Sequence, residues 1–551
     1  MAEERIARRK HIGGFHRALD YCLSAAGVGL DDLDMLVVST CAEEPLEDGC
    51  DLGLPIAREK VRAMPSHHLS HAYSAFLTSP FDEAVVMIFD NEGNIVGGRR
   101  SPHYWDNRVE RNSYYVGRGT ELEPLTAADD RLADDELGPG EIYRHFTYFL
   151  GWPSYVYAGK TMGLAPYGRR RILDDVQVFR LEAGQIHSLL LNGRETPPAS
   201  VTALGHASGV PLGPPRSPGE PLTPRHGEIA ALVQDELERA LIYKAEELYK
   251  LTGIKNLCLG GGVALNCVAN RRILDDTPFE RLYVCSAPGD TGQCLGNAIY
   301  GWTRLAGHGR PAPIRPYLGR RYSRSEIAAA IAAQGDLVTC ERSAQVAADA
   351  ARLLADSHVI AWFQGGSELG PRALGARSIL ADPRLFAMGD YLNLVVKGRE
   401  PFRPYGPSVL AEAAERFFDL PQHSPYMELV GTVRPEMRSR IPAVVHIDGT
   451  SRVHTVVEGD SPLFARLLTE FERLTGFPLV LNTSFNMGGE PIVESPEDAL
   501  RCFLRSELDV LIMDEFIVRR ASRPASPGFR RWAAAAEPVA RPYGGPATGN
   551  R

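Results

Sequence analysis

The sequence predicts an α/β protein with more than one domain. Its 551 residues are too many for a single hydrophobic core, and its hydrophobic (44%) and charged (23%) fractions are ordinary for a globular protein. Short apolar runs bounded by turn residues alternate with segments of helical period, which is typical of α/β layers. The first runs expected to form strands are Met35–Val38, Ala84–Phe89, Leu257–Leu259 and Leu282–Cys285.

The remaining pattern predicts where the domains divide. Residues 228–251 have the spacing of a long helix with one buried face, whereas the proline and glycine density of residues 197–226 predicts a surface excursion. A Pro-rich stretch, residues 309–319, precedes a new pattern in which 344–354 is helical and 359–363 is a strand. We therefore expect one domain at residues 1–318, a second at 319–521 and a disordered tail at 522–551.

Charge and cysteine content exclude several classes of protein. A net charge of -9 gives no broad positive field for a nucleic acid backbone. The nine cysteines are scattered and odd in number, which favours reduced thiols in a cytoplasmic protein. The charged N-terminus and the lack of a long apolar run predict a soluble protein that needs no membrane.

Two histidines and two aspartates are candidate metal ligands. On a helix, His67 and His71 present both imidazoles on one face, and Asp90 follows a predicted strand nineteen residues after His71. Asp290 lies in the turn of Gly289–Gly296, where it could instead cap a helix. An isolated HxxxH pair is also common among ordinary core or surface histidines. Imidazole and carboxylate donors suit iron, zinc or manganese better than magnesium.

Two glycine-rich segments invite comparison with phosphate-binding loops. Gly260, Gly261 and Gly262 join a predicted strand to a helix, where backbone amides could meet an anion, although a tight turn without a ligand fits equally well. The segment Gly159-Lys160-Thr161 lacks the spacing of a Walker motif, so we reject the interpretation that it binds phosphate as a Walker loop.

Positive charge is concentrated beyond the predicted domain boundary. Arg372 and Arg377 lie in one glycine-rich string, and Lys397, Arg399 and Arg403 lie in another. Guanidinium groups bind phosphate oxygens bidentately, so these strings favour a small polyanion site, with a solvated loop as the alternative. The segments His446–Arg452 and Asn482–Asn486 add further polar groups.

Taken together and in this order, the motifs resemble the NodU/CmcH-type O-carbamoyltransferase family of nodulation and cephamycin-biosynthesis enzymes. The resemblance spans roughly residues 3 to 520. It rests on Glu3-Glu4-Arg5, Lys10-His11, HHLSHA, GKTMGLAPYG, GGGVALN, GDTGQCLG, GPRALGARSILADPR, KGREPFRP, HIDGTSR and NTSFN. It implies an N-terminal domain of the actin-like ATPase (ASKHA, TsaD-like) superfamily and an α+β, YrdC-like C-terminal domain.

The resemblance also implies a two-step reaction. The C-terminal domain is expected to form carbamoyl-adenylate from carbamoyl phosphate and Mg²⁺-bound ATP, and the N-terminal domain to pass the carbamoyl group to a hydroxyl of a small molecule, expected to be a secondary metabolite such as an antibiotic. A reactive mixed anhydride favours a water-poor route between the two steps.

Individual site residues follow from the motif matches. The nucleotide pattern matches Lys397, Arg399, Ser484 and Asn486, and the candidates for carbamoyl phosphate and the transferred group are Arg372, His446 and Arg452. The metal ligands would be His67, His71, Asp90 and Asp290, with Fe²⁺ favoured over Zn²⁺ or Mn²⁺. Adenosine would lie on Gly260, Gly261, Gly262 and Asn266. Further candidates for positioning or proton transfer are Lys10, His11, His68 and Lys160.

Two departures from the family pattern qualify these expectations. Family members begin with a strand hairpin before the Glu3-Glu4-Arg5 string, and we expect that hairpin to be absent here. Gly366 stands where a basic residue is expected, which would remove one phosphate contact.

Three other functions compete with carbamoyl transfer. A homodimer is a separate expectation. The missing hairpin favours an ATP-binding regulatory or scaffold homologue, and the domain resemblance allows a tRNA threonylcarbamoylation-type enzyme. A non-haem iron oxygenase would use only His67, His71 and Asp90 and leaves the C-terminal motifs without a purpose.

Overall fold

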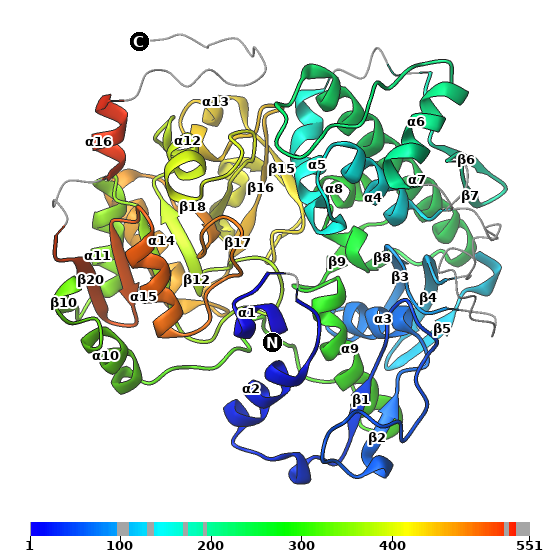
Figure 1. Ribbon diagram of the computed structural model, residues 1–551, viewed down its shortest axis with the longest axis horizontal. Helices are drawn as coiled ribbons and strands as arrows, with labels where there is room; N and C mark the ends of the chain where they lie inside the picture. Colours follow the sequence, from blue (N-terminus) through cyan, green and yellow to red (C-terminus); the bar gives the residue numbers. More distant parts are fainter. Residues whose placement is uncertain are drawn as a thin grey trace. The chain divides into compact units, whose positions relative to one another are not determined.

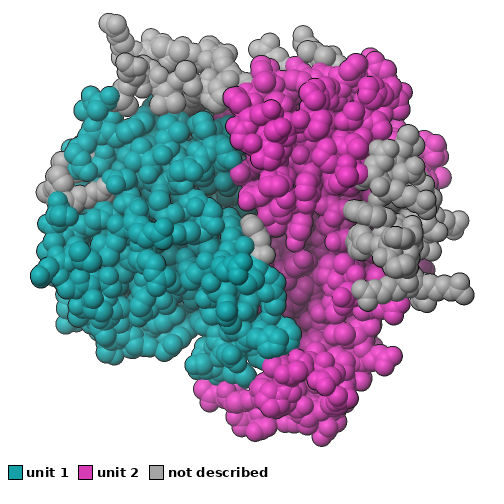
Figure 2. Space-filling model, in the orientation of Figure 1, with its two compact units in different colours: residues 1–25, 315–551 teal, residues 26–314 magenta. Residues whose placement is uncertain are grey.

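The computed structural model describes residues 2–10, 12–95, 109–128, 137–168, 173, 175–190, 196–522 and 528–535. The chain forms two compact units, coloured separately in Figure 2: unit 1 comprises residues 1–25 and 315–551, and unit 2 comprises residues 26–314. The division near residue 314 lies close to the predicted boundary. Residues 1–25, however, were expected in the N-terminal domain and belong to unit 1, because Arg5, Arg8 and Tyr21 bond to residues 368–498.

Unit 2 is built on a five-stranded mixed sheet with the order β5-β4-β3-β8-β9. Strands β3 (Glu83–Phe89), β8 (Asn256–Gly260) and β9 (Arg281–Val284) are parallel, whereas β4 (Asn112–Arg118) and β5 (Glu121–Pro124) continue the sheet antiparallel from β3. Three predicted strands thus lie within this sheet. The fourth predicted strand is β1 (Leu36–Val38), which pairs in parallel with β2 (Val61–Ala63), and β6 (Phe179–Glu182) pairs with β7 (Gln185–Ser188).

Helices of unit 2 pack around this sheet (Figure 1). The long predicted helix is confirmed as α7 (Pro224–Thr252), which ends where Gly253 adopts a left-handed φ of 66°. Further helices of unit 2 include α3 (His67–Leu77), α4 (Pro139–Phe149), α5 (Ala158–Leu164), α8 (Cys267–Asp276) and α9 (Gln293–Tyr300).

The predicted surface excursion at residues 197–226 is wrong in its first part. Residues Pro197–Ala207 form helix α6, in which Val201 and Leu204 are buried. Proline is tolerated in the first helical turn because the amide that it lacks has no intrahelical partner there. The two prolines therefore begin a core helix.

Unit 1 contains an eight-stranded mixed sheet with the order β10-β20-β19-β11-β12-β18-β13-β17. The pairs β11/β19 and β13/β17 are parallel, and the other neighbours are antiparallel. Its strands are β10 (Val338–Arg342), β11 (Ile360–Phe363), β12 (Arg377–Ala381), β13 (Gly406–Leu410), β17 (His454–Val456), β18 (Leu479–Ser484), β19 (Val510–Met513) and β20 (Phe516–Arg520). A second sheet joins β14 (Phe418–Asp419), β15 (Val430–Val433) and β16 (Thr450–Arg452).

The helices of unit 1 include the first and last helices of the described chain. They are α1 (Glu3–Ala7), α2 (His16–Ala26, ending at the boundary), α10 (Arg324–Ala332), α11 (Val346–Ala355), α12 (Met388–Tyr391), α13 (Pro435–Arg438), α14 (Pro462–Thr475), α15 (Pro496–Arg505) and α16 (Gly528–Ala535). Helix α16 corrects the prediction of a wholly disordered tail, because its Phe529 packs edge-on against Tyr391 at 5.8 Å between ring centroids. Among the described residues, we find no helix with the length and apolar character that crossing a bilayer requires.

Candidate active sites

Three elements of unit 2 bring the predicted metal ligands together. Helix α3 begins after Ser66, whose hydroxyl accepts a hydrogen bond from the amide of Leu69 at 3.1 Å. The helical spacing then places His67 and His71 on one face. Asp90 directly follows β3, and Asp290 opens the short 3₁₀ turn Asp290–Gly292 that follows β9. Because β3, β8 and β9 are parallel, both acids leave the sheet at the same edge.

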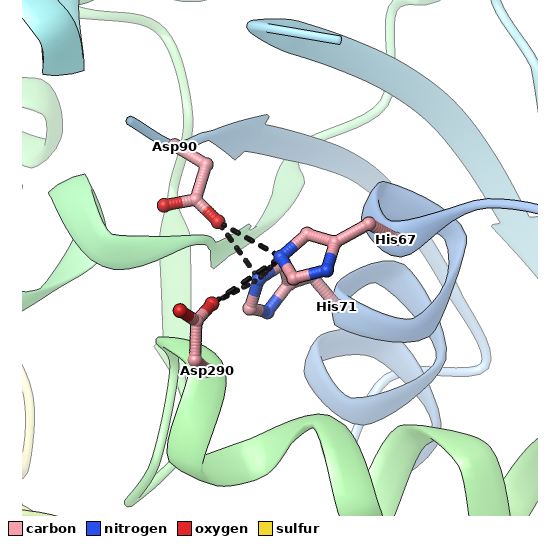
Figure 3. A group of neighbouring side chains, drawn as sticks. All are labelled: His67, His71, Asp90 and Asp290. Atoms are coloured by element: carbon pink, nitrogen blue, oxygen red, sulfur yellow. Dashed lines mark hydrogen bonds and ion pairs between the residues drawn. The ribbon is translucent and has the colours of Figure 1, made fainter. Parts of the chain in front are cut away.

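The four side chains point toward one another (Figure 3). His71 Nε2 lies 2.9 Å from Asp90 Oδ2, and His67 Nε2 lies 3.2 Å from Asp290 Oδ1. The two Nε2 atoms are 3.2 Å apart. One candidate ligand atom from each residue lies within 4.8 Å of all the others, so a single metal ion could bind all four. Two imidazoles with two carboxylates suit iron, zinc or manganese, and the geometry does not choose among them.

A second layer of contacts fixes the orientation of His67. Its Nδ1 lies 3.1 Å from the carbonyl oxygen of Thr40, which can only accept, so Nδ1 carries a proton and Nε2 is the nitrogen that faces the cluster. Asn94 supports this arrangement. Its side chain accepts from the His67 amide at 2.6 Å and donates to the Thr40 carbonyl at 3.1 Å.

The triple-glycine turn holds Asp90 in place. The Gly262 amide donates to Asp90 Oδ1 at 3.1 Å, and the Asn91 amide donates to the same oxygen at 2.8 Å. Gly261 has a left-handed φ of 84°, and a Cβ there would lie 2.2 Å from the carbonyl oxygen of Phe89. The glycines thus let the turn approach the end of β3, while their predicted contact with adenosine stays a prediction.

Electrostatics in this cluster favours ion pairs between the histidines and aspartates. Burial lowers the pKa of His67, but hydrogen bonds to Asp290 and Asp90 outweigh burial and raise it to about 10. The pKa of His71 is raised through the same partners. Burial raises the pKa of Asp90, whereas the two histidines lower it well below its ordinary value. A metal ion that binds here must displace the imidazolium protons.

The other unit 2 candidates lie in separate contacts. His68 is buried, its Nδ1 lies 2.8 Å from Ser113 Oγ, and burial lowers its pKa to about 4. Asn266 caps α8 by accepting from the Ala269 amide at 3.1 Å. Lys160 lies over the ring of Tyr157 at 4.5 Å. His68 is thus buried away from the four-residue cluster, and the predicted roles of His68, Asn266 and Lys160 stay predictions.

In unit 1 the structure brings Lys397, Ser484 and Asn486 together. The buried ammonium of Lys397 donates to the Ser484 carbonyl, to the Asn486 carbonyl at 3.0 Å and to Asn486 Oδ1 at 2.9 Å. Burial lowers the pKa of Lys397 well below its ordinary value, and the positive charges of Arg399, Arg403 and Lys10 lower it further. Lys397 therefore organises the Ser484–Asn486 segment in a strongly positive environment.

Arg399 lies beside this cluster and is held by two neighbours. Its Nε donates to Asn393 Oδ1 at 2.7 Å, and its guanidinium lies 4.6 Å from the centroid of the Tyr405 ring. Tyr405 donates to the same Asn393 oxygen at 2.8 Å. Lys10 belongs to the same electrostatic neighbourhood through its effect on Lys397, while His11 lies outside the described residues.

A second cationic cluster contains Arg372 and Arg452 around the buried Glu428. Arg372 Nε lies 3.7 Å from Glu428 Oε1. Burial raises the pKa of Glu428 to about 8, although Arg372 and Arg452 both lower it. His446 Nδ1 lies 3.8 Å from Asp448 Oδ1 in the loop before β16. Asn482 of β18, two residues before Ser484, donates to the Ala373 carbonyl, next to Arg372, at 3.0 Å.

Glu428 gives a pH dependence of stability that can be tested. Below about pH 4 both folded and unfolded chains hold its proton, whereas between pH 4.5 and about 8 only the folded protein does. The free energy of unfolding therefore falls as pH rises through this window and levels off above it. Glu428→Gln should remove up to about 1.4 kcal/mol per pH unit of this slope, measured by urea unfolding from pH 5 to 8.5. Parallel profiles for the two proteins would contradict this assignment.

Arg377 behaves differently from the prediction, and Gly366 lies in a tightly packed position. Arg377 is fully buried, donates to the backbone carbonyls of Gln364 and Ala376 at 3.0 and 3.1 Å, and stacks 3.6 Å from the Phe363 centroid. It therefore does not face an anion. Gly366 packs against Gly319, where a Cβ would lie 2.4 Å from the carbonyl oxygen, so this position has no room for the expected basic side chain.

Four supporting residues were not predicted from sequence. Thr40 and Asn94 orient His67, Glu428 lies between two arginines, and Arg8 bonds to Ile492. Only Arg8 carried a signal, since it lies between the Glu3-Glu4-Arg5 and Lys10-His11 strings.

These features define a two-unit α/β protein with a candidate metal centre in one unit and cationic clusters in the other. Family models agree with this division. The carbamoyltransferase N-terminus model matches residues 53–299, and the carbamoyltransferase C-terminus model matches residues 351–520.

Curated relatives extend the similarity over most of the chain. The uncharacterized protein sll1178 of Synechocystis sp. is 34% identical, over 96% of this chain and 94% of its own length. Nodulation protein NolNO of Sinorhizobium fredii is 35% identical, over 95% of this chain and 77% of its own length. Nodulation protein NolO of Bradyrhizobium diazoefficiens is 36% identical, over 86% of this chain and 81% of its own length. The chain belongs to the carbamoyltransferase family, as the motifs predicted, and is an enzyme that transfers carbamoyl groups.

Solved structures give a weaker likeness. Full-length HypF, solved in its phosphate- and nucleotide-bound form, has a TM-score of 0.28 and 14% identity, over 45% of this chain and 44% of that chain. An overlap this small defines neither fold nor function, so the actin-like and YrdC-like assignments stay predictions.

Proposed function

We propose that the enzyme makes carbamoyl-adenylate in unit 1 and transfers its carbamoyl group to a hydroxyl of a small molecule in unit 2. The observation that carries the first step is the meeting of Lys397, Ser484 and Asn486 beside Arg399. Membership of the carbamoyltransferase family supports the second step.

The first step needs fixed positive charge. Water releases phosphate from carbamoyl phosphate and leaves carbamate, whose oxygen attacks the α-phosphorus of ATP. The α–β phosphoanhydride bond breaks, and pyrophosphate leaves with the bonding electron pair. Arg399 and Lys397 neutralise negative charge around the nucleotide, and Arg372 and Arg452 bind carbamoyl phosphate. Mg²⁺ on ATP completes the neutralisation.

The second step forms the carbamate ester. The acceptor oxygen attacks the carbamoyl carbon, AMP leaves with the electron pair of the broken C–O bond, and the hydroxyl proton passes to a base. The residues His67, His71, Asp90 and Asp290 would hold a transition metal, with Fe²⁺ favoured, that supplies Lewis acidity when bound. Thr40 and Asn94 keep the His67 imidazole in the required tautomer. The acceptor in this proposal is a secondary metabolite.

The test separates the two steps. In the absence of any acceptor, carbamoyl phosphate should make the enzyme exchange labelled pyrophosphate into ATP. With a panel of hydroxyl compounds, product should gain about 43 Da, the mass of a carbamoyl group replacing hydrogen, and AMP should accumulate in equal amount. Exchange that needs no carbamoyl phosphate, or carbamoylation that proceeds without ATP, would exclude carbamoyl-adenylate as the intermediate.

A further inference from the structure

Residues 2–10, which we call the N-terminal strap, contact unit 1 mainly through two arginines. Arg5 is 3% exposed, and its guanidinium donates to the carbonyls of Glu368 at 2.8 Å and Gly370 at 2.6 Å. Arg8 donates to the carbonyls of Ile492 at 2.7 Å and Pro491 at 3.1 Å. The strap therefore holds two backbone segments that are more than a hundred residues apart.

The segment held by Arg5 leads directly into Arg372. The Glu368 side chain stabilises this segment, because its Oε1 accepts hydrogen bonds from the amides of Leu374 at 2.7 Å and Ala376 at 2.8 Å. Gly370 has a φ of 102°, a conformation that a glycine adopts without strain and that a neighbouring hydrogen bond can select. The Arg5 guanidinium fixes the carbonyl on this glycine, two residues before Arg372.

The segment held by Arg8 leads back to Asn486. Asn486 Nδ2 donates to the Glu490 carbonyl at 2.6 Å, which closes a short loop between Asn486 and Pro491. Arg8 also lies 3.4 Å from Asp498, near the start of α15. The same loop receives the ammonium of Lys397 at its other end.

We propose that Arg5 and Arg8 are positioning residues, with Arg5 orienting the Arg372 segment for carbamoyl phosphate and Arg8 orienting the Asn486 loop for ATP. This inference rests on the proposed function of unit 1. The Arg5 guanidinium contacts two backbone carbonyls, and the Arg8 guanidinium contacts two backbone carbonyls and Asp498, so we expect both to act through the residues that they hold. A charged donor to a buried carbonyl contributes enough to bias a loop between conformations.

The test is a comparison of Michaelis constants in the full-length enzyme by pyrophosphate exchange. Arg5→Gln should raise KM for carbamoyl phosphate about tenfold and leave KM for ATP within about threefold. Arg8→Gln should show the opposite preference. Arg5→Lys, which keeps the charge but donates to fewer carbonyls, should fall between wild type and Arg5→Gln. Arg9→Gln is the matched control, because Arg9 lies on the same strap and is exposed.

The outcomes distinguish this inference from the proposed function. Wild-type enzyme without carbamoyl-phosphate-dependent exchange would refute the proposed function itself. Active wild type with unchanged constants in folded Arg5→Gln and Arg8→Gln would refute the positioning role alone. Equal loss for both substrates in both variants would mean that the strap only stabilises unit 1, and it would also overturn the inference. If Arg5→Gln does not fold, Arg5→Lys with a wild-type KM for carbamoyl phosphate has the same consequence.

Discussion

Replacing His71 with alanine is expected to abolish metal binding by unit 2 and, with it, carbamoylation of the acceptor. His71 is fully buried and its Nε2 lies within 3.6 Å of both acidic ligands, so its removal takes away one donor and leaves two carboxylates close together. Loss of an outer contact to a metal ligand costs up to about 100-fold in affinity, and loss of the ligand itself should exceed that. Metal content after dialysis, measured by elemental analysis, checks the result directly.

The control for this variant is His68→Gln. His68 lies on the same helix and is equally buried, but its Nδ1 faces Ser113, outside the cluster. This variant should keep its metal. Pyrophosphate exchange should persist in both variants, because the residues proposed for that step belong to unit 1. Retention of one tightly bound metal ion by folded His71→Ala would show that the four-residue cluster is not the site.

Part of the candidate metal cluster was predictable from local signals, whereas the full set of four ligands was implied by the family resemblance. A four-residue spacing on a helix places His67 and His71 on one face, and parallel strands place Asp90 and Asp290 at one sheet edge. The residues that orient the cluster gave no such signal. Thr40 acts through its backbone carbonyl, which every residue carries, and Asn94 is one polar loop residue among many.

Two errors in the fold prediction have different physical causes. Proline density suggested a loop at residues 197–207, although the prolines occupy the first turn of α6 and Val201 and Leu204 supply its buried face. Residues 1–25 were assigned by their position in the chain. Their place in unit 1 depends on side-chain hydrogen bonds that span more than 360 residues, which no local pattern reveals.

Arg377 shows where charge alone misleads. It lies five residues after Arg372 in a string rich in glycine, and both were expected to bind an anion. In the structure the Arg377 guanidinium stacks on Phe363, and its Nη1 donates to backbone carbonyls inside the core. Arg372 instead lies near a buried carboxylate and remains a candidate for carbamoyl phosphate.

Replacing Lys397 with methionine is expected to remove the first step of the reaction while leaving the metal centre intact. Methionine has a similar unbranched chain but no charge, so the Ser484 and Asn486 oxygens lose the ammonium that gathers them. Loss of these contacts should displace Ser484 and Asn486 from the nucleotide, and we expect a cost like that of removing one preorganised donor, about 100-fold to 1,000-fold in rate. Carbamoyl-phosphate-dependent pyrophosphate exchange should fall by this factor, and metal content should stay at the wild-type value.

The magnitude follows from the burial of Lys397. When an exposed lysine is replaced, water takes over the hydrogen bonds that its ammonium made. Lys397 is 3% exposed, so its loss leaves buried oxygens without their donor. Lys250→Met provides the contrast, because the Lys250 ammonium is exposed and pairs with Glu247 at the surface. That variant should exchange pyrophosphate at the wild-type rate. If folded Lys397→Met also stays within about threefold of wild type, the ammonium has no part in the chemistry and the nucleotide must bind elsewhere in the protein.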